Sequence, residues 1–287
     1  MEQVISAEMR DFFHANGYIL VKGVVPKQNC DSVIETIWAF TGQRPDDPES
    51  WYQPASGMDT FWKHQREGML PLFHHQTMWD NRQHPRLYRA FAELLEEERL
   101  WVSIDRVNMK PPRREDFTQF NTGFIHWDTD TSKLTFPLPR PPRVQGVLYL
   151  ADTAADQGGF QCVPSLYRDF ESWIAAQPDD RHPTLPDITG HDIVPIPGEA
   201  GDLLIWDVLL AHGNGQNYTS KPRFAQYISM FPAVPGVCRD DMVEGWRNRT
   251  GPSFAPEDPR GWERGPGTEP ARLTELGRKL LGQDPWP

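Results

Sequence analysis

Hydrophobic positions in the N-terminal third of the chain recur at helical spacing. Apolar side chains three and four positions apart predict amphipathic helices over residues 7–16 and 28–40, and a third helix is expected over residues 85–97. Gly17 follows the first segment, and glycine commonly ends helices. Residues 18–25 are rich in β-formers and predict a strand. Residues 43–60 are rich in Pro, Asp and Ser and predict a loop.

Short strand-like segments bounded by Pro, Gly and Asp follow after residue 100. They are expected over residues 101–109, 124–128, 144–150, 159–163, 192–196, 202–206, 209–212 and 223–231, with one helix over residues 167–176. This spacing predicts a sandwich or jelly roll, so the fold class is mainly β with flanking helices. We expect one domain over residues 1–234. Residues 235–287 would form a Pro/Gly-rich extension that packs on it or partly covers its site, with a helix over residues 271–281.

The composition excludes several classes of protein. The chain has 287 residues, 38% hydrophobic and 24% charged, which is typical of a globular protein with a sizeable core. A net charge of −11 argues against a nucleic-acid partner. Cys30, Cys162 and Cys238 are too widely spaced for a disulfide framework or a zinc site, which favours a reducing, cytoplasmic setting. We expect no signal peptide and no membrane-spanning segment.

The triplet His126-Trp127-Asp128 is the most informative stretch of the sequence. Side chains alternate across a β-strand, so His126 and Asp128 would share one face and Trp127 would take the other. One more imidazole would complete the 2-His-1-carboxylate set of non-haem Fe(II) oxygenases. His212, which ends an expected strand before a Gly-Asn-Gly turn, is the best candidate. Each of these motifs alone is common by chance.

Arg223 makes the metal hypothesis more specific. It lies eleven positions after His212, on an expected strand where residues 223, 225, 227 and 229 share one face. A guanidinium binds a carboxylate in bidentate geometry, so this arginine is suited to hold a dicarboxylate. Taken alone, it would instead be interpreted as a surface arginine on an edge strand.

With these residues in view, the sequence resembles the phytanoyl-CoA dioxygenase-like (PhyH) family of Fe(II)/2-oxoglutarate oxygenases over residues 8–231. The resemblance rests on the order and spacing of Phe12–Gly17–Tyr18–Val21, His126-Trp127-Asp128, Gly158-Gly159-Phe160 with Val163-Pro164-Ser165, Gly201 to Trp206, and His212-Gly213-Asn214-Gly215 with Asn217 and Arg223. There are two departures. Leu166-Tyr167 follows Ser165 where the family often has Pro-Gly-Ser-His, and Ala225 stands where related oxygenases often have Ser.

The resemblance implies a double-stranded β-helix core, which is a cupin-like jelly roll. The residues that would bind Fe(II) and act in catalysis are His126, Asp128 and His212. Arg223 would bind the far carboxylate of 2-oxoglutarate. Gln145 and Asn108 are expected on neighbouring core strands, where they would contact 2-oxoglutarate, although a one-residue register shift would turn both outward.

The implied activity is hydroxylation or other oxidation of a small organic molecule by O2, with decarboxylation of 2-oxoglutarate to succinate. Asp128 favours oxygenation over halogenation, because related halogenases have a small residue at this position. Desaturation, cyclisation and epimerisation stay open. The long segments 43–80, 111–122 and 129–143 are expected around the cavity mouth. The residues that suggest an anionic substrate are Arg113, Arg114, Arg140 and Arg143, and the candidate pocket tryptophans are Trp62, Trp127 and Trp206.

Two other functions are compatible with the sequence. One is a cupin-like metal-dependent isomerase or hydrolase that uses the same three ligands without 2-oxoglutarate. The other is a non-catalytic jelly-roll binding protein, with Arg223 on the surface and His126 in the core. His74-His75 is not expected to form a second metal site, because adjacent side chains diverge. We expect a monomer or weak dimer with no nucleic-acid or membrane partner.

Overall fold

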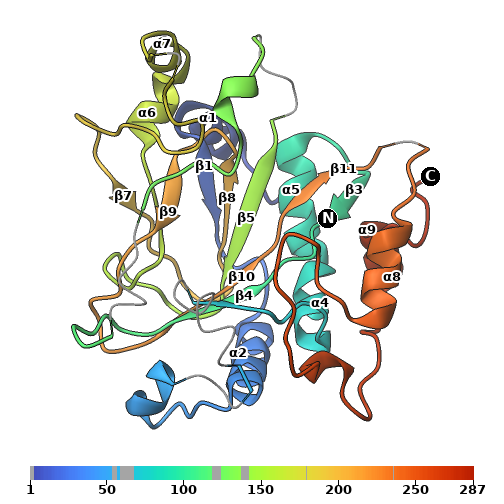
Figure 1. The fold of residues 1–287 in the computed structure, drawn as a ribbon. Helices are drawn as coiled ribbons and strands as arrows, with labels where there is room; N and C mark the ends of the chain where they lie inside the picture. The colour runs from blue at the N-terminus through green and yellow to red at the C-terminus, as the bar shows by residue number, and fades with distance from the viewer. Residues whose placement is uncertain are drawn as a thin grey trace.

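A six-stranded antiparallel sheet forms the centre of the computed structural model, which describes residues 3–53, 57–58, 68–117, 124–136, 142–178, 180–234 and 236–287. Its strands, in spatial order, are β1 (Tyr18–Val21), β8 (Leu203–Asp207), β5 (Val144–Tyr149), β10 (Arg223–Tyr227), β4 (Val107–Lys110) and β2 (Met69–Leu70) (Figure 1). Neighbouring strands come from distant parts of the chain. The sheet therefore joins the N-terminal segment to the later strands.

A three-stranded sheet lies on one side of the main sheet (Figure 1). It contains β7 (Val194–Pro195), β6 (Phe160–Cys162) and β9 (His212–Asn214). The side chains packed between the two sheets include Tyr149, Phe160, Leu204, Trp206 and Ala225. This layer of apolar residues shows that alternate positions of β5, β8 and β10 point toward the smaller sheet, as strand geometry requires.

Helices cover the other side of the main sheet, where most of the hydrophobic core lies (Figure 1). The α-helices are α1 (Ala7–Asn16), α2 (Lys27–Thr41), α4 (Gln76–Arg82), α5 (Pro85–Leu95), α6 (Pro164–Arg168), α7 (Phe170–Ala175), α8 (Asp240–Asn248) and α9 (Glu275–Leu281). Short 3-10 helices are η1 (Pro48–Tyr52), η4 (Thr131–Lys133) and η5 (Trp262–Arg264). The expected class, mainly β with flanking helices, is confirmed.

The expected long strands over residues 101–109 and 223–231 are each divided in two. β3 (Leu100–Val102) pairs with β11 (Met230–Pro232), whereas β4 pairs with β10 in the main sheet. Ser103 and Ser229 lie at the two breaks, where the Ser103 amide donates to the Ser229 carbonyl at 2.8 Å and the Ser229 amide donates to Ser103 Oγ at 3.0 Å. Both segments of the chain thus leave the main sheet at the same level.

Two other predicted elements, near the candidate ligands His126, Asp128 and His212, are wrong. Residues 124–128 form no strand, because the Trp127 amide and indole donate to the carbonyls of Thr184 and Leu209. His212 begins β9 instead of ending a strand, because residues 208–210 turn around Asp207. The predicted helices over 7–16, 28–40 and 85–97 are confirmed, and the helix over 167–176 is replaced by the pair α6 and α7.

The C-terminal extension packs beside α4, α5 and β3, on the side away from the three-stranded sheet (Figure 1). Two side chains attach it firmly. The Glu263 carboxylate accepts the amides of Phe73 and His74 at 2.8 and 2.6 Å, and the Trp286 indole donates to the Leu100 carbonyl at 2.9 Å. Its own helices, α8 and α9, are only partly anticipated by the sequence.

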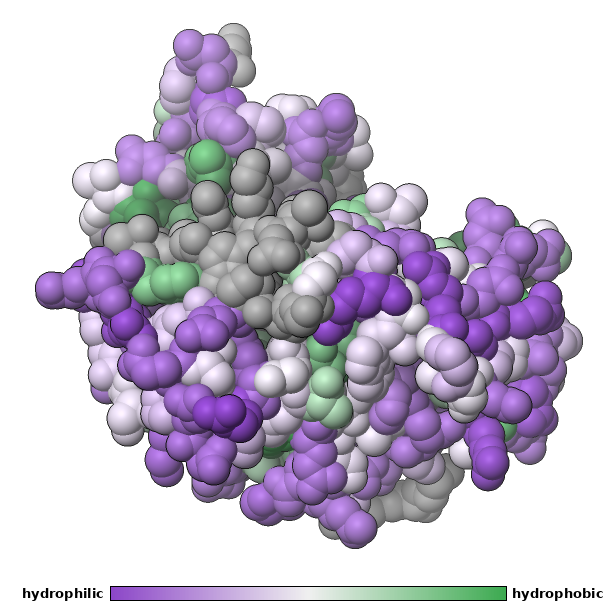
Figure 2. Space-filling model, turned by 60° about the horizontal axis from the view of Figure 1, so that its bottom comes forward, coloured by the Kyte–Doolittle hydropathy of each residue, from purple (hydrophilic) through white to green (hydrophobic). Residues whose placement is uncertain are grey.

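The surface agrees with the charge of the chain. Figure 2 shows a mainly hydrophilic face, with small apolar patches beside the grey residues. Among the described residues, no helix combines the length and hydropathy required to cross a bilayer. All three cysteines are free, as expected, with Cys30 and Cys162 buried.

Glu263 makes the attachment of the extension sensitive to pH. Burial raises its pKa from 4.5 to about 7, against the hydrogen bonds that lower it. The folded state therefore holds the proton more tightly, so stability is full below pH 4.5 and falls as the pH rises toward 7. We expect this loss to be on the order of 3 kcal/mol. Urea unfolding between pH 4.5 and 7.5 should show a weaker pH dependence for Glu263→Gln than for wild type. Glu257→Gln, at an exposed position, is the control, and equal slopes for all three proteins would contradict this assignment.

Candidate metal centre

Three potential ligands from two distant segments meet in the structure. His126 Nε2 lies 3.2 Å from Asp128 Oδ1, and His212 Nε2 lies 3.5 Å from Asp128 Oδ2. One ligand atom from each of the three residues lies within 4.8 Å of the others. Atoms bound at about 2.1 Å to one ion, at right angles, stand about 3.0 Å apart. Asp128 therefore lies near this spacing from both imidazoles, and the three side chains form a group that could hold one metal ion.

A backbone bridge holds the two histidines side by side. The His126 amide donates to the His212 carbonyl at 2.8 Å, and the His212 amide returns a bond to the His126 carbonyl at 3.0 Å. Gly213 allows this close approach, because a Cβ there would collide with the carbonyl oxygen of Phe124. The resulting pair places the imidazole rings 4.8 Å apart. His126 and Asp128 are thus brought to β9 without forming a strand.

The ring of His212 is oriented by its surroundings. Its Nδ1 lies 2.9 Å from the carbonyl oxygen of Leu210, so a proton on Nδ1 completes a hydrogen bond. This tautomer leaves the Nε2 lone pair available to a metal, which is the usual arrangement around ligand histidines. The Phe160 ring stacks on the imidazole at a centroid distance of 5.6 Å and an interplanar angle of 11°. The ring of His212 is consequently fixed in orientation, and its Nδ1 is occupied by the backbone.

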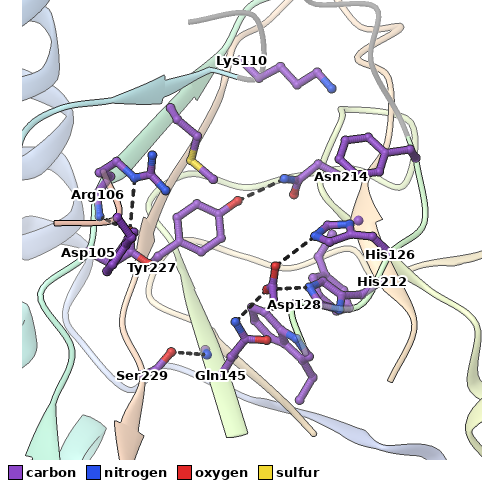
Figure 3. A pocket seen from close by; sticks show the side chains of 17 residues that line it. Asp105, Arg106, Lys110, His126, Asp128, Gln145, His212, Asn214, Tyr227 and Ser229 are labelled. Carbon is purple, nitrogen blue, oxygen red and sulfur yellow. Dashed lines mark hydrogen bonds and ion pairs between the residues drawn. The ribbon is translucent and has the colours of Figure 1, made fainter. Parts of the chain in front are cut away.

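Asp128 carries the negative charge of the centre. Desolvation in the cavity opposes ionisation, but the close side chains of His126, His212 and Gln145 outweigh it and hold the pKa of Asp128 well below its usual range. Gln145 Nε2 donates to Asp128 Oδ2 at 2.8 Å from the neighbouring strand β5 (Figure 3). Gln145 therefore contacts the candidate ligand directly, and its expected place on an inward-facing strand position agrees with the structure.

A cavity of about 540 Å³ opens in front of the three candidate ligands (Figure 3). Its volume falls in the range of small-molecule sites. The side chains that line it come from both sheets and from the C-terminal extension, and they include Lys110, His126, Asp128, Tyr227, Phe254 and Trp206. The cavity thus combines a potential metal site with polar and aromatic walls.

Arg223 lies behind the wall of this cavity. Its side chain is 1% exposed, and its guanidinium carbon lies 6.0 Å from the centre of the Tyr227 ring. Nη1 donates to Asn108 Oδ1 at 2.8 Å, whereas Nε and Nη2 have no hydrogen-bond partner among the described residues. Asn108 is fully buried and contacts Arg223 instead of lining the cavity. A buried guanidinium with two unsatisfied donors is costly without an anion.

The sequence profile of the phytanoyl-CoA dioxygenase (PhyH) family matches residues 13–225. The chain belongs to this family. The predicted resemblance is therefore confirmed, and the protein is a dioxygenase-type oxidoreductase whose family is associated with iron and 2-oxoglutarate.

Curated relatives match the chain at low sequence identity. Ava biosynthesis cluster protein O of Aspergillus versicolor is 24% identical over 251 residues, which are 78% of this chain and 77% of the relative. An ectoine dioxygenase of Sphingopyxis alaskensis is 23% identical over 197 residues, which are 63% of this chain and 58% of the relative.

Solved structures share this fold although their sequences have low identity to this chain. The GlcNAc Inducible Gene 2 protein of Candida albicans superimposes with a TM-score of 0.70 at 11% identity and covers 100% of this chain and 78% of its own. The epimerase SnoN, solved with Fe3+, alpha ketoglutarate and nogalamycin RO, gives a TM-score of 0.52 at 16% identity, with 93% and 94% covered. These similarities establish a shared fold.

Three of the four arginines that suggested an anionic substrate do not line the cavity of this PhyH protein. Arg114 pairs with Glu49 and Asp116, and Arg113 lies over the Tyr218 ring. Arg143 lines a different cavity, of about 500 Å³. Arg140 and Trp62 lie outside the described residues.

Two further expectations concern aromatic residues and histidines. Trp206 lines the cavity, whereas Trp127 is buried away from it against Phe170 and Trp173. His74 and His75 do not converge on one site, since His74 Nε2 contacts the Thr250 carbonyl and His75 Nδ1 contacts Thr77. Neither belongs to a three-residue metal cluster within the described part of the chain.

Several cavity residues of this PhyH protein were missed at the level of sequence. They are Asp105, Arg106, Lys110, Tyr227 and Phe254. The alternation of residues 106, 108 and 110 on one strand face was available as a signal. This signal is weak in the sequence, because residues 101–109 have the pattern of one continuous strand and its partner strand is not evident.

Gly213 offers a test of the backbone bridge. We expect Gly213→Ala to separate residues 124–126 from β9 and to lower the affinity for Mn(II) or Fe(II) about tenfold or more, because metal affinity depends on how its ligands are oriented. Isothermal titration calorimetry measures this directly. Gly215→Ala is the matched control, since its Cβ would meet only the flexible Gln161 side chain, at 3.2 Å. Equal metal affinities for both variants would contradict the role given to Gly213.

Proposed function

We propose that this protein is an Fe(II)/2-oxoglutarate-dependent dioxygenase that hydroxylates or otherwise oxidises a small organic molecule. The observation that carries the proposal is the convergence of His126, Asp128 and His212 at a cavity with the buried Arg223 behind its wall. In this proposal the two facing sheets are the double-stranded β-helix core. Residues 1–234 form the catalytic domain, and residues 235–287 form an extension that contributes Phe254 to the cavity.

The donor set fits iron. Two imidazole nitrogens and one carboxylate oxygen on one side of an ion leave the opposite positions open, as in non-haem Fe(II) oxygenases. When bound, Fe(II) supplies the redox chemistry that couples O2 reduction and decarboxylation of 2-oxoglutarate to substrate oxidation. The chain itself orients the ligands, through the Leu210 carbonyl at His212 and the Gln145 amide at Asp128.

Arg223 is assigned to the far carboxylate of 2-oxoglutarate. Its unsatisfied Nε and Nη2 offer the two parallel donors that a carboxylate accepts. Asn108 holds the guanidinium through Nη1, so it would act on the co-substrate through Arg223. Tyr227 lies between this guanidinium and the cavity, and its hydroxyl accepts a bond from Asn214 at 3.1 Å. Co-substrate entry would therefore require Tyr227 or Arg223 to change rotamer.

We assign Gln145 mainly to positioning Asp128, and secondly to contact with 2-oxoglutarate. Its Nε2 is used by the Asp128 carboxylate, and its buried Oε1 has no partner among the described residues. The Asp128 carboxylate itself occupies the position that a halide takes in related halogenases, so we assign oxygenation as the reaction. In this proposal the bound substrate determines whether hydroxylation, desaturation, cyclisation or epimerisation takes place.

The alternatives make different predictions. A non-catalytic binding protein with Arg223 on the surface disagrees with the 1% exposure of that side chain. An isomerase or hydrolase with the same three ligands would need metal but would leave 2-oxoglutarate intact. Succinate release in the presence of O2 separates this alternative from the proposal.

The charge-transfer band of an Fe(II)–2-oxoglutarate complex tests the function. Anaerobic addition of Fe(II) and 2-oxoglutarate to wild type should produce a weak visible band, and Asp128→Ala should abolish both the band and 2-oxoglutarate-dependent succinate release. Asp130→Ala is the matched control, because its carboxylate bonds to Ser132 and Lys133 outside the cavity lining. A wild-type protein that gives no band would refute the proposed function.

Replacement of Arg223 tests the co-substrate site. We expect Arg223→Gln to weaken 2-oxoglutarate binding about a hundredfold, or roughly 3 kcal/mol, because two charge-assisted hydrogen bonds are lost. Mn(II) affinity measured by calorimetry should change little, since Arg223 contacts none of the three candidate ligands. Asn108→Ala should weaken 2-oxoglutarate less than Arg223→Gln. Unchanged 2-oxoglutarate affinity in Arg223→Gln would contradict this assignment.

A further inference from the structure

Three cations face the interior from β4, from the residue before it and from β10. Arg106 directly precedes β4, where strand alternation places it on the same face as Asn108 and Lys110, and Arg223 lies opposite Lys110 on β10. Arg106 and Lys110 both line the cavity, and their backbones are about 13 Å apart. The Arg223 guanidinium is instead buried beside Asn108, behind the Tyr227 ring, so Arg106 and Arg223 can hold different anions.

Arg106 is held rigidly at the opposite end of the cavity. Its carbonyl oxygen accepts the Tyr227 amide at 3.0 Å, and the preceding carbonyl, of Asp105, accepts Nη2 of the buried Arg82 at 2.7 Å. Its Nε donates to Asp105 Oδ1 at 3.3 Å (Figure 3). The guanidinium carbon lies 5.8 Å from the centre of the Phe254 ring, close enough for a cation–π contact.

The far side of this guanidinium lacks a hydrogen-bond partner in the described part of the protein. Nη1 and Nη2 of Arg106 make no hydrogen bond with any described residue, although the side chain is only 18% exposed. Arg99 and Arg114, by comparison, place two nitrogens each on carboxylates. A partly buried, preorganised fork with two unused donors matches a carboxylate or a similar planar anion.

The neighbouring walls are apolar. Phe254 and Phe124 both line the cavity and are 65% and 48% exposed, which is unusual for phenylalanine in a folded chain. Met69, on β2 beside β4, adds a flexible apolar side chain to the lining. A ligand anchored at Arg106 would therefore lay an apolar body along aromatic side chains on its way to the metal ligands.

The geometry points to Arg106 as the residue that recognises the substrate, through a carboxylate carried by an amphipathic acid whose apolar body packs on Phe254 and Phe124. Asp105 is the positioning residue that holds Nε. This inference rests on the proposed function, because it assigns the co-substrate to Arg223 and the primary substrate to the opposite end of the same cavity. It also gives the C-terminal extension a part in substrate binding, through Phe254.

Matched acids and amides test the assignment. The probes are 3-phenylpropanoate and octanoate, each compared with its amide, and they are titrated by calorimetry into protein loaded with Mn(II) and saturating 2-oxoglutarate. Wild type should bind the acids about tenfold or more tightly than the amides. Arg106→Gln should remove this preference, Arg106→Lys should keep part of it, and Phe254→Ala should weaken acid and amide alike.

Two controls separate this test from the test of the proposed function. Arg99→Gln, at an exposed ion pair with Glu97, should bind the acids like wild type. Arg106→Gln should bind 2-oxoglutarate within about twofold of wild type, and circular dichroism should confirm its fold. Failure of every acid to bind, an unchanged acid preference in Arg106→Gln, or a large loss of 2-oxoglutarate affinity in that variant would each overturn the assignment. Only a missing charge-transfer band in wild type would overturn the dioxygenase function itself.

Discussion

The backbone bridge between His126 and His212 is the constraint on which the rest of the site depends. Two amide–carbonyl bonds attach an irregular segment to the start of β9, and Gly213 leaves room for the Phe124 carbonyl beside them. Without this attachment the two imidazoles would not lie side by side, because they belong to distant parts of the chain. Asp128, two residues further on, then reaches both rings without any strand geometry of its own. Strand alternation thus predicts that His126 and Asp128 lie together, although the segment that places them there is not a strand.

The cavity is asymmetric because its walls differ in the kind of structure that supports them. The main sheet supplies Lys110, Gln145 and Tyr227 from β4, β5 and β10, whose backbones are fixed by ladder hydrogen bonds. The smaller sheet supplies His212, whereas the other two candidate ligands come from an irregular segment that the backbone bridge holds against β9. Phe254 lies on a loop of the C-terminal extension, where a side chain can adapt to the shape of a ligand.

The sequence was sufficient to predict the family, most of the helices and the three residues that converge as candidate ligands. These features depend on local patterns, such as the His-x-Asp triplet and the helical spacing around Val33 and Ile37. The cavity cations were not predictable in the same way. Arg106 becomes a cavity residue only because the chain breaks at Ser103, where β3 leaves for β11 and β4 joins the main sheet. At that break Ser103 bonds to Ser229, which lies between β10 and β11, more than a hundred residues away.

The arginines illustrate why charge counted along a sequence is a poor guide to ligand binding. Arg113 and Arg114 form the denser basic cluster, yet in the folded chain Arg114 is neutralised by Glu49 and Asp116. Arg223 keeps two buried donors without a partner among the described residues, and Arg106 meets one carboxylate through Nε alone, which leaves its other two nitrogens unused. A guanidinium whose nitrogens are taken up by several carboxylates stabilises the fold. The buried, unsatisfied nitrogens of Arg223 impose a desolvation cost that folding alone does not offset, and an anionic ligand is the most direct way to remove it.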